Sequence, residues 1–217
     1  YHSDALKIAK IYNYVDRQVN NLLYLGNISN SLAEYKQAVK YFDEALIILQ
    51  NHNNLEVKTE VLRGRAYAYH QQNQTEQATQ DYLRALAFDR ESKNVLGITA
   101  NQIYLANIYS DSGDYSKAIQ YYTEALQYSP LGALNGFGNV ALAQGNVIKA
   151  IDYYKQTLTI AQHKEEWEEE GNALNNLAYA YRKQNNLIET EKYLRNAINV
   201  WQKLRDKLDD SNKISIF

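Results

Sequence analysis

Side-chain amides recur along this sequence at related positions, and their chemistry suits them to hold a peptide. Asn27, Asn107 and Asn139 occupy equivalent places in an internal repeat, in a series that Tyr67 and Tyr179 complete. A side-chain amide carries both an N–H donor and a C=O acceptor. An extended peptide has one donor and one acceptor per residue, and both need partners once water is removed. A row of such amides could therefore bind a peptide backbone without reading much of its sequence.

Neighbouring positions add polar and charged groups to this row. Arginine and lysine there could pair with an acidic group on a ligand. The alternative for any single asparagine is that it is solvated or bonded to a neighbouring repeat, and plain solvation is the simpler role for the histidine. The complete candidate set is Asn27, Arg63, Tyr67, His70, Asn107, Asn135, Asn139, Asn175, Tyr179, Arg182 and Lys183.

The elements that must position these residues follow from the repeat itself. The typical repeat has a small residue, an aromatic residue four positions later and a second small residue three positions further, as in Ala118, Tyr122 and Ala125. This spacing places the three side chains on one stripe of a helix. Another small residue lies twelve positions before each set, so each repeat predicts two amphipathic helices with a short turn between them. The sets begin at positions 38, 78, 118, 150 and 190.

Packing considerations extend these helix pairs into a solenoid. Small residues let two helices approach closely, and the aromatic side chain fills the groove between them. Each helical hairpin leaves one apolar face uncovered, and the next hairpin covers it. With one proline and nine glycines, the 217 residues contain few helix breakers. We therefore predict an all-α protein built as a solenoid of hairpins.

Residues 105–130, LANIYSDSGDYSKAIQYYTEALQYSP, resemble a near-consensus tetratricopeptide repeat (TPR), and the resemblance extends over nearly the whole chain in five complete units. It implies a right-handed superhelix in which the first helix of each hairpin lines a concave surface, where the candidate residues would face a ligand. Arg65, Thr190 and Leu194 depart from the family pattern. Three of the four steps between units are 40 residues, longer than the common period of about 34, and similar to TPR proteins such as kinesin light chains.

The repeat positions also predict the domain organisation. They give one TPR superhelix over residues 1–204, with a half repeat at residues 1–10 and repeats at 19–52, 59–92, 99–130, 131–164 and 171–204. Residues 205–217 would then be a C-terminal extension or a linker to a missing domain. The leading half repeat would lack its first helix, and an uncapped solenoid end exposes apolar surface. We therefore expect the chain to be part of a longer protein. Residues 204–217 are similar to the segment that joins TPR arrays to the caspase-like CHAT domain of bacterial, notably cyanobacterial, proteins, whose catalytic residues would lie beyond Phe217.

Composition disfavours several other functions. The net charge of −2 offers no basic footprint for nucleic acid, and no apolar run approaches the length of a membrane span. The chain has no cysteine, and its four histidines lie far apart, so we expect no metal and no cofactor.

The absence of a signal peptide and of cysteine fits a cytoplasmic protein. The acidic run around Trp167 is better explained as a solvated helix start than as a catalytic carboxylate pair.

These observations lead to a functional prediction. No nucleophile–base pair emerges from the residues, so we predict that the chain is not an enzyme. We expect a protein-interaction scaffold that binds a peptide or protein domain in its concave groove. The tail resemblance further implies that it regulates, or recruits substrate to, a CHAT domain in the same chain. The alternative is a structural or self-associating spacer module that has no groove ligand.

Overall fold

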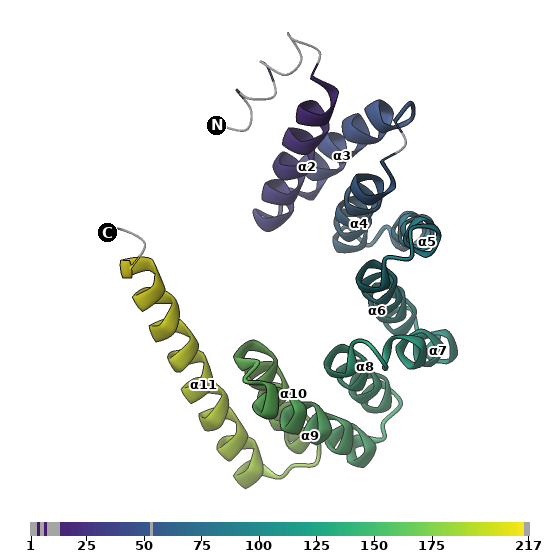
Figure 1. Cartoon of the computed structure of the whole chain (residues 1–217). Helices are drawn as coiled ribbons and strands as arrows, with labels where there is room; N and C mark the ends of the chain where they lie inside the picture. The colour runs from purple at the N-terminus through teal and green to yellow at the C-terminus, as the bar shows by residue number, and fades with distance from the viewer. Residues whose placement is uncertain (1–3, 5–6, 8–13, 53, 215–217) are drawn as a thin grey trace. The chain divides into compact units, whose positions relative to one another are not determined.

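The computed structural model of the chain describes residues 4, 7, 14–52 and 54–214 (Figure 1). Within these residues the chain forms helices and no strand, which confirms the predicted all-α class. Most of the predicted half repeat at residues 1–10, and the last three residues of the predicted C-terminal extension, lie outside the described residues.

The helices fall into two compact units, residues 1–108 and 109–217. Unit 1 holds α2 (Val15–Ser31), α3 (Tyr35–Leu49), α4 (Leu55–Gln71) and α5 (Thr75–Glu91), and α6 (Val95–Asp111) begins in it. Unit 2 holds α7 (Tyr115–Ala125), α8 (Pro130–Ala143), α9 (Val147–Lys164), α10 (Trp167–Lys183) and α11 (Leu187–Ile214).

Within each unit the helices pack as successive hairpins. In unit 1, α2 packs on α3 and α4 on α5, and α3 also contacts α4. In unit 2, α8 packs on α9 and α10 on α11, while α9 contacts α10 and α7 contacts α8. Within a unit, neighbouring hairpins therefore cover each other's open faces, as the repeat predicted.

The turns inside the hairpins share one backbone device. Each contains a residue with positive φ, and these residues recur at the repeat spacing. A left-handed residue after a helix lets the following N–H groups bond back to the last carbonyls; for example, the Asn146 N–H donates to the Ala141 carbonyl at 2.8 Å. The chain consequently reverses within a few residues, and within a unit this places the second helix of a hairpin against the first. The positive-φ residues are Ala33, Asn73, Gly113, Gly145 and Asn185.

Buried aromatic rings fill the space between neighbouring helices, and glycines make room for them. In unit 1, a Cβ atom on Gly26 or on Gly64 would lie 2.5 Å from the ring of Phe42, which is fully buried. In unit 2, a Cβ atom on Gly136 would lie 2.2 Å from the ring of Tyr122. These distances are far below van der Waals contact, so any larger side chain must displace a buried ring.

This close approach predicts the effect of Gly136→Val. We expect the free energy of unfolding to fall by about 2 kcal/mol, because overpacking a filled core costs about 1–3 kcal/mol and the helix propensity gained over glycine offsets only a few tenths. Urea denaturation followed by circular dichroism measures the change. Ala143→Val, at an exposed position in the same helix, is the control and is expected to stay close to the unmodified chain. A Gly136→Val variant as stable as this control would contradict the packing described here.

Candidate functional site

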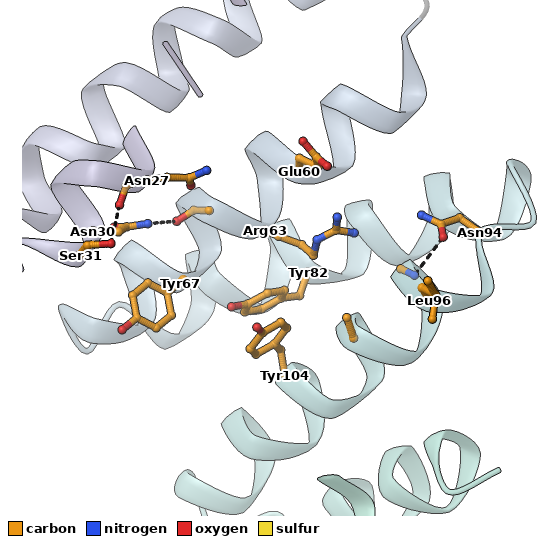
Figure 2. Close-up of a pocket in the computed structure, with 13 residues that line it drawn as sticks. Asn27, Asn30, Ser31, Glu60, Arg63, Tyr67, Tyr82, Asn94, Leu96 and Tyr104 are labelled. Atoms are coloured by element: carbon orange, nitrogen blue, oxygen red, sulfur yellow. Dashed lines mark hydrogen bonds between the residues drawn. The ribbon is translucent and has the colours of Figure 1, made fainter. Parts of the chain in front are cut away.

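The inner faces of three successive first helices form a groove of about 750 Å³ in unit 1 (Figure 2). Helices α2, α4 and the first half of α6 supply its walls, and α5 contributes one ring. Its volume lies within the range of about 300–1,000 Å³ that is usual for ligand sites. The residues that line the groove are Asn27, Asn30, Ser31, Glu60, Arg63, Gly64, Tyr67, Tyr82, Asn94, Leu96, Gly97, Ala100 and Tyr104.

Aromatic and aliphatic side chains form much of the groove surface. The buried ring of Tyr82 stacks on Tyr104 with centroids 5.0 Å apart, and Tyr67 meets Tyr35 edge-on at 6.2 Å. Tyr104 and Tyr67 remain 41% and 39% exposed, and Leu96 is 82% exposed. Burial raises the pKa of Tyr82 and, together with Tyr35, that of Tyr67, so both phenols stay neutral at ordinary pH. The groove thus presents uncharged rings on which a bulky ligand side chain can pack.

A buried carboxylate lies beneath the one basic residue of the groove. Asp89, at the end of α5, is 0% exposed and accepts three side-chain hydrogen bonds. The donors are Arg63 Nη1 at 3.0 Å, Asn94 Nδ2 at 2.8 Å and Asn101 Nδ2 at 2.7 Å. Gly97 leaves the space that this carboxylate occupies, since a Cβ atom there would lie 2.4 Å from it. The positive charge of Arg63 is therefore balanced from within the fold.

Other polar groups of the groove also hold the helices in place. Asn30 Nδ2 donates to the Gly64 carbonyl at 2.9 Å and thereby links α2 to α4. The Ser31 hydroxyl donates to the Asn27 carbonyl at 3.1 Å, and Asn94 Oδ1 caps α6 by accepting from the Gly97 N–H at 3.1 Å. The polar wall is thus largely preorganised by internal hydrogen bonds.

Three of the predicted site residues meet in this groove: Asn27 from α2, and Arg63 and Tyr67 from α4. His70, in the last turn of α4, and Asn107, in α6, are both partly buried and do not line it.

The predicted set included neither Glu60 nor any of the α6 residues that line the groove. The spacing of residues along each helix could have predicted that these side chains share the face that lines the groove. Glu60 lies one turn before Arg63 on the same face of α4, and Leu96, Ala100 and Tyr104 follow one another at four-residue spacing on α6.

Two of the three predicted asparagines of unit 2 form hydrogen bonds with other helices. Asn176 Nδ2 donates to Asn135 Oδ1 at 2.6 Å and joins α10 to α8. The hydroxyl of the buried Tyr154 donates to Asn139 Oδ1 at 2.8 Å. For these two predicted residues, the structure shows the alternative of a bond to a neighbouring helix. Asn175 stays exposed on α10.

The remaining predicted residues lie toward the end of α10. Tyr179, Arg182 and Lys183 are exposed, and the Lys183 ammonium lies 5.3 Å from the centre of the Tyr179 ring. Arg182 and Lys183 occupy the last turn of the helix, where the negative end of the helix dipole favours basic side chains.

The acidic run at residues 165–170 leads into α10. Glu168, Glu169 and Glu170 form its first turn, which the helix dipole favours. Burial, followed by the charges of Glu168 and Glu166, raises the pKa of Glu169. Trp167 packs against the Leu174 core cluster, with the Lys207 ammonium 4.6 Å from its ring centre.

The described part of the chain lacks two other kinds of functional feature. Within it, no group of histidine, cysteine, aspartate or glutamate side chains is arranged to hold a metal ion. No helix among the described residues combines the length and the apolar character that crossing a membrane requires.

The hairpin architecture defines a helical-repeat protein, and comparison with protein families identifies which kind. Three tetratricopeptide repeat models match residues 17–93, 100–131 and 131–203, and the chain belongs to this family. No curated protein is detectably similar to it in sequence.

Solved structures share the fold at low sequence identity. BtubC (BKLC) from P. vanneervenii is 18% identical with a TM-score of 0.75, and the match covers 94% of this chain and 89% of that one. A putative kinesin light chain from Podosopora anserina is 16% identical with a TM-score of 0.66, covering 86% and 96%. The apo quorum sensor NprR from B. thuringiensis is 18% identical with a TM-score of 0.73, covering 89% of this chain and 57% of that one. At these identities the comparisons establish the fold alone.

Proposed function

We propose that the chain is a protein-interaction scaffold that binds an extended segment of another protein in the groove of unit 1. The observation that carries the proposal is the exposure of Tyr67, Leu96 and Tyr104 within one preformed hollow. Clustered exposed apolar side chains with a polar rim mark interaction surfaces. The quorum sensor NprR shows that this fold occurs in a protein with a sensing role.

The groove offers recognition groups rather than a reactive centre, and we propose no catalytic role for the chain. Its lining contains no histidine, lysine or cysteine. The one aliphatic hydroxyl, on Ser31, donates to a carbonyl of its own helix, so no base activates it. An intramolecular CHAT domain as the partner, and a cytoplasmic location, stay predictions from the sequence.

A self-associating spacer is the second candidate, because apolar residues also lie exposed outside the groove. Ile148 and Ile188, near the starts of α9 and α11, are largely exposed. Light scattering of the chain over a range of concentrations tests this alternative: a mass that rises to that of a dimer supports it, and a constant monomer mass argues against it.

The groove proposal predicts how paired alanine variants bind peptide. A random peptide library displayed on phage is selected on the full chain, and the Kd of an enriched peptide is measured by fluorescence anisotropy. Asn27→Ala combined with Leu96→Ala removes two exposed groove side chains without disturbing helix formation. We expect the Kd to rise about tenfold, equivalent to about 1.4 kcal/mol.

The matched control removes apolar surface elsewhere on unit 1. Ile47→Ala combined with Leu83→Ala truncates exposed residues on the second helices α3 and α5. This pair is expected to leave the Kd within about twofold, since exposed positions away from a binding site contribute little. Equal Kd values for the two paired variants, or a library from which the chain enriches nothing, would refute the groove as the binding site.

A further inference from the structure

We propose that the groove of unit 1 selects a basic peptide segment, with a lysine or arginine next to a bulky apolar residue, over an acidic one. This inference rests on the proposed function and specifies the chemistry of the partner. It reverses the expectation from the sequence, in which Arg63 would pair with an acidic group on the ligand. The juxtaposition that carries it is a neutralised Arg63, an exposed Glu60 and the partly exposed rings of Tyr67 and Tyr104 around one hollow.

Arg63 is already committed to a partner inside the fold. Its guanidinium is the only cation among the three donors that hold Asp89, and that carboxylate is fully buried. A ligand carboxylate that drew Arg63 away would leave Asp89 as a buried charge without a counterion, which is strongly unfavourable. Arg63 therefore serves as part of the wall, and Asp89 offsets the charge that it would otherwise present to an acidic ligand.

Glu60 supplies the charge that the ligand meets. Figure 2 shows Glu60 and Arg63 on α4, and in this view the ring of Tyr82 lies between Arg63 and the ring of Tyr104. Glu60 is exposed, and it forms no ion pair with the described part of the chain. Since Arg63 and Asp89 cancel, the groove is left with one net negative charge, which favours a cationic ligand and disfavours an anionic one.

The partly exposed rings of Tyr67 and Tyr104 have no cation over them in the described part of the chain, whereas several other tyrosine rings do. In the described residues, a lysine ammonium lies 4.9 Å from the ring centre of Tyr109, 5.3 Å from that of Tyr179 and 5.4 Å from that of Tyr193. No basic side chain of the described residues covers Tyr67 or Tyr104 in this way. Aromatic faces attract ammonium and guanidinium groups, so a lysine or arginine of the ligand can take the place that a chain lysine takes elsewhere.

The first arm of the test reads the preference from the selected peptides. Phage selection on the full chain is expected to enrich lysine or arginine within about two residues of phenylalanine, tyrosine, tryptophan or leucine, a reach set by the rise of about 3.3 Å per extended residue. An enriched peptide and a copy with its basic residues replaced by glutamate are then compared by fluorescence anisotropy. We expect the copy to bind at least about tenfold more weakly.

The second arm assigns the preference to one carboxylate. Glu60→Gln keeps the size of the side chain and removes its charge, and it is expected to weaken the basic peptide about threefold to fivefold. The effect should shrink as salt is added, because exposed charges are screened. Glu76→Gln makes the same change of net charge at an exposed site in the first turn of α5 and is expected to leave the Kd unchanged.

The outcomes separate this inference from the proposed function. If peptides bind and the paired groove variant weakens them, but the glutamate copy binds as tightly as the basic peptide or more tightly, the selectivity proposal is overturned while the binding function stands. The same holds if Glu60→Gln and Glu76→Gln give equal Kd values. If no peptide is enriched, or if the paired groove variant binds normally, the binding function fails and the selectivity proposal fails with it.

Discussion

Replacing Asp89 with alanine is expected to lower the free energy of unfolding by about 3–5 kcal/mol, the cost of breaking a buried charge pair by removing one partner. The loss has two sources. Arg63 would keep its charge with no counterion beneath it, and the amides of Asn94 and Asn101 would lose their acceptor. Because these residues connect α4, α5 and α6, hydrogen exchange should show the lost protection concentrated in those three helices.

Two further variants make this prediction specific to the carboxylate. Asp89→Asn keeps the shape of the side chain but turns an amide group toward three donors, so it is expected to be nearly as destabilising. Asp152→Ala in α9 removes an exposed carboxylate that accepts a hydrogen bond from the neighbouring Gln156, and it should change stability by less than about 0.5 kcal/mol. Thermal melting of all three variants measures the difference. An Asp89→Ala variant with the same melting temperature as Asp152→Ala would disprove the role assigned to Asp89.

Arg65→Leu is expected to cost a similar amount, although leucine is the residue that the family pattern has at this position. Arg65 holds the buried Asp81 by two bonds, from Nε at 2.7 Å and from Nη2 at 2.8 Å, and also bonds to Asp43. Burial alone would lower the pKa of Arg65, but these hydrogen bonds outweigh it and raise the pKa, so the guanidinium stays charged. Leucine would leave Asp81 as a buried anion without a partner, at about 3–5 kcal/mol.

The double variant Arg65→Leu with Asp81→Tyr should recover most of this loss. The equivalent positions in the first and last hairpins hold Leu25 with Tyr41 and Leu177 with Tyr193, all of which belong to or pack against their core clusters. Replacing a buried ion pair with well-packed apolar residues is often neutral or stabilising. A double-mutant cycle from urea denaturation measures the coupling. A double variant no more stable than Arg65→Leu alone would contradict this interpretation.

Both predictions concern the hairpin of α4 and α5, where ion pairs replace contacts that are apolar in the first hairpin. Leu23 and Leu49 lie in the buried core of the first hairpin, and Arg63 and Asp89 occupy the equivalent positions in the second. Buried ion pairs are weak evidence for stability, so a gain in stability does not explain why the second hairpin has Arg63 and Asp89 where the first has two leucines. The ion pair gives the groove a polar wall that internal hydrogen bonds hold in place, and its positive charge is balanced by Asp89.

Much of the fold could be predicted from the sequence because its determinants are local. The spacing of Ala118, Tyr122 and Ala125 fixes which face of a helix is buried, whichever neighbour covers it. Recurrence of that spacing then predicts stacked hairpins. The positive-φ turn residues follow the same period. They include Ala33, although alanine is not a residue type that favours the left-handed conformation.

The candidate site was only partly predictable, because repeat position tells which face a residue lies on and not what it contacts there. Asn27, Arg63 and Tyr67 do meet in one groove. Asn135 and Asn139 share the predicted rows, yet each accepts a hydrogen bond from another side chain of unit 2. A bond such as that from Asn176 to Asn135 spans 41 positions, and no periodicity within one helix can reveal it.

The amino-acid sequence by itself determined the family, the helical class and the rows of residues on each first helix, since those depend on residue type and local spacing. Only the tertiary structure decided which of those residues keep a free charge. Arg63 looks like an anion-binding residue until α5 brings Asp89, 26 positions away, beneath it. The physical reason is that the charge a ligand meets is the sum over all neighbouring helices, and that sum exists only once the helices are packed.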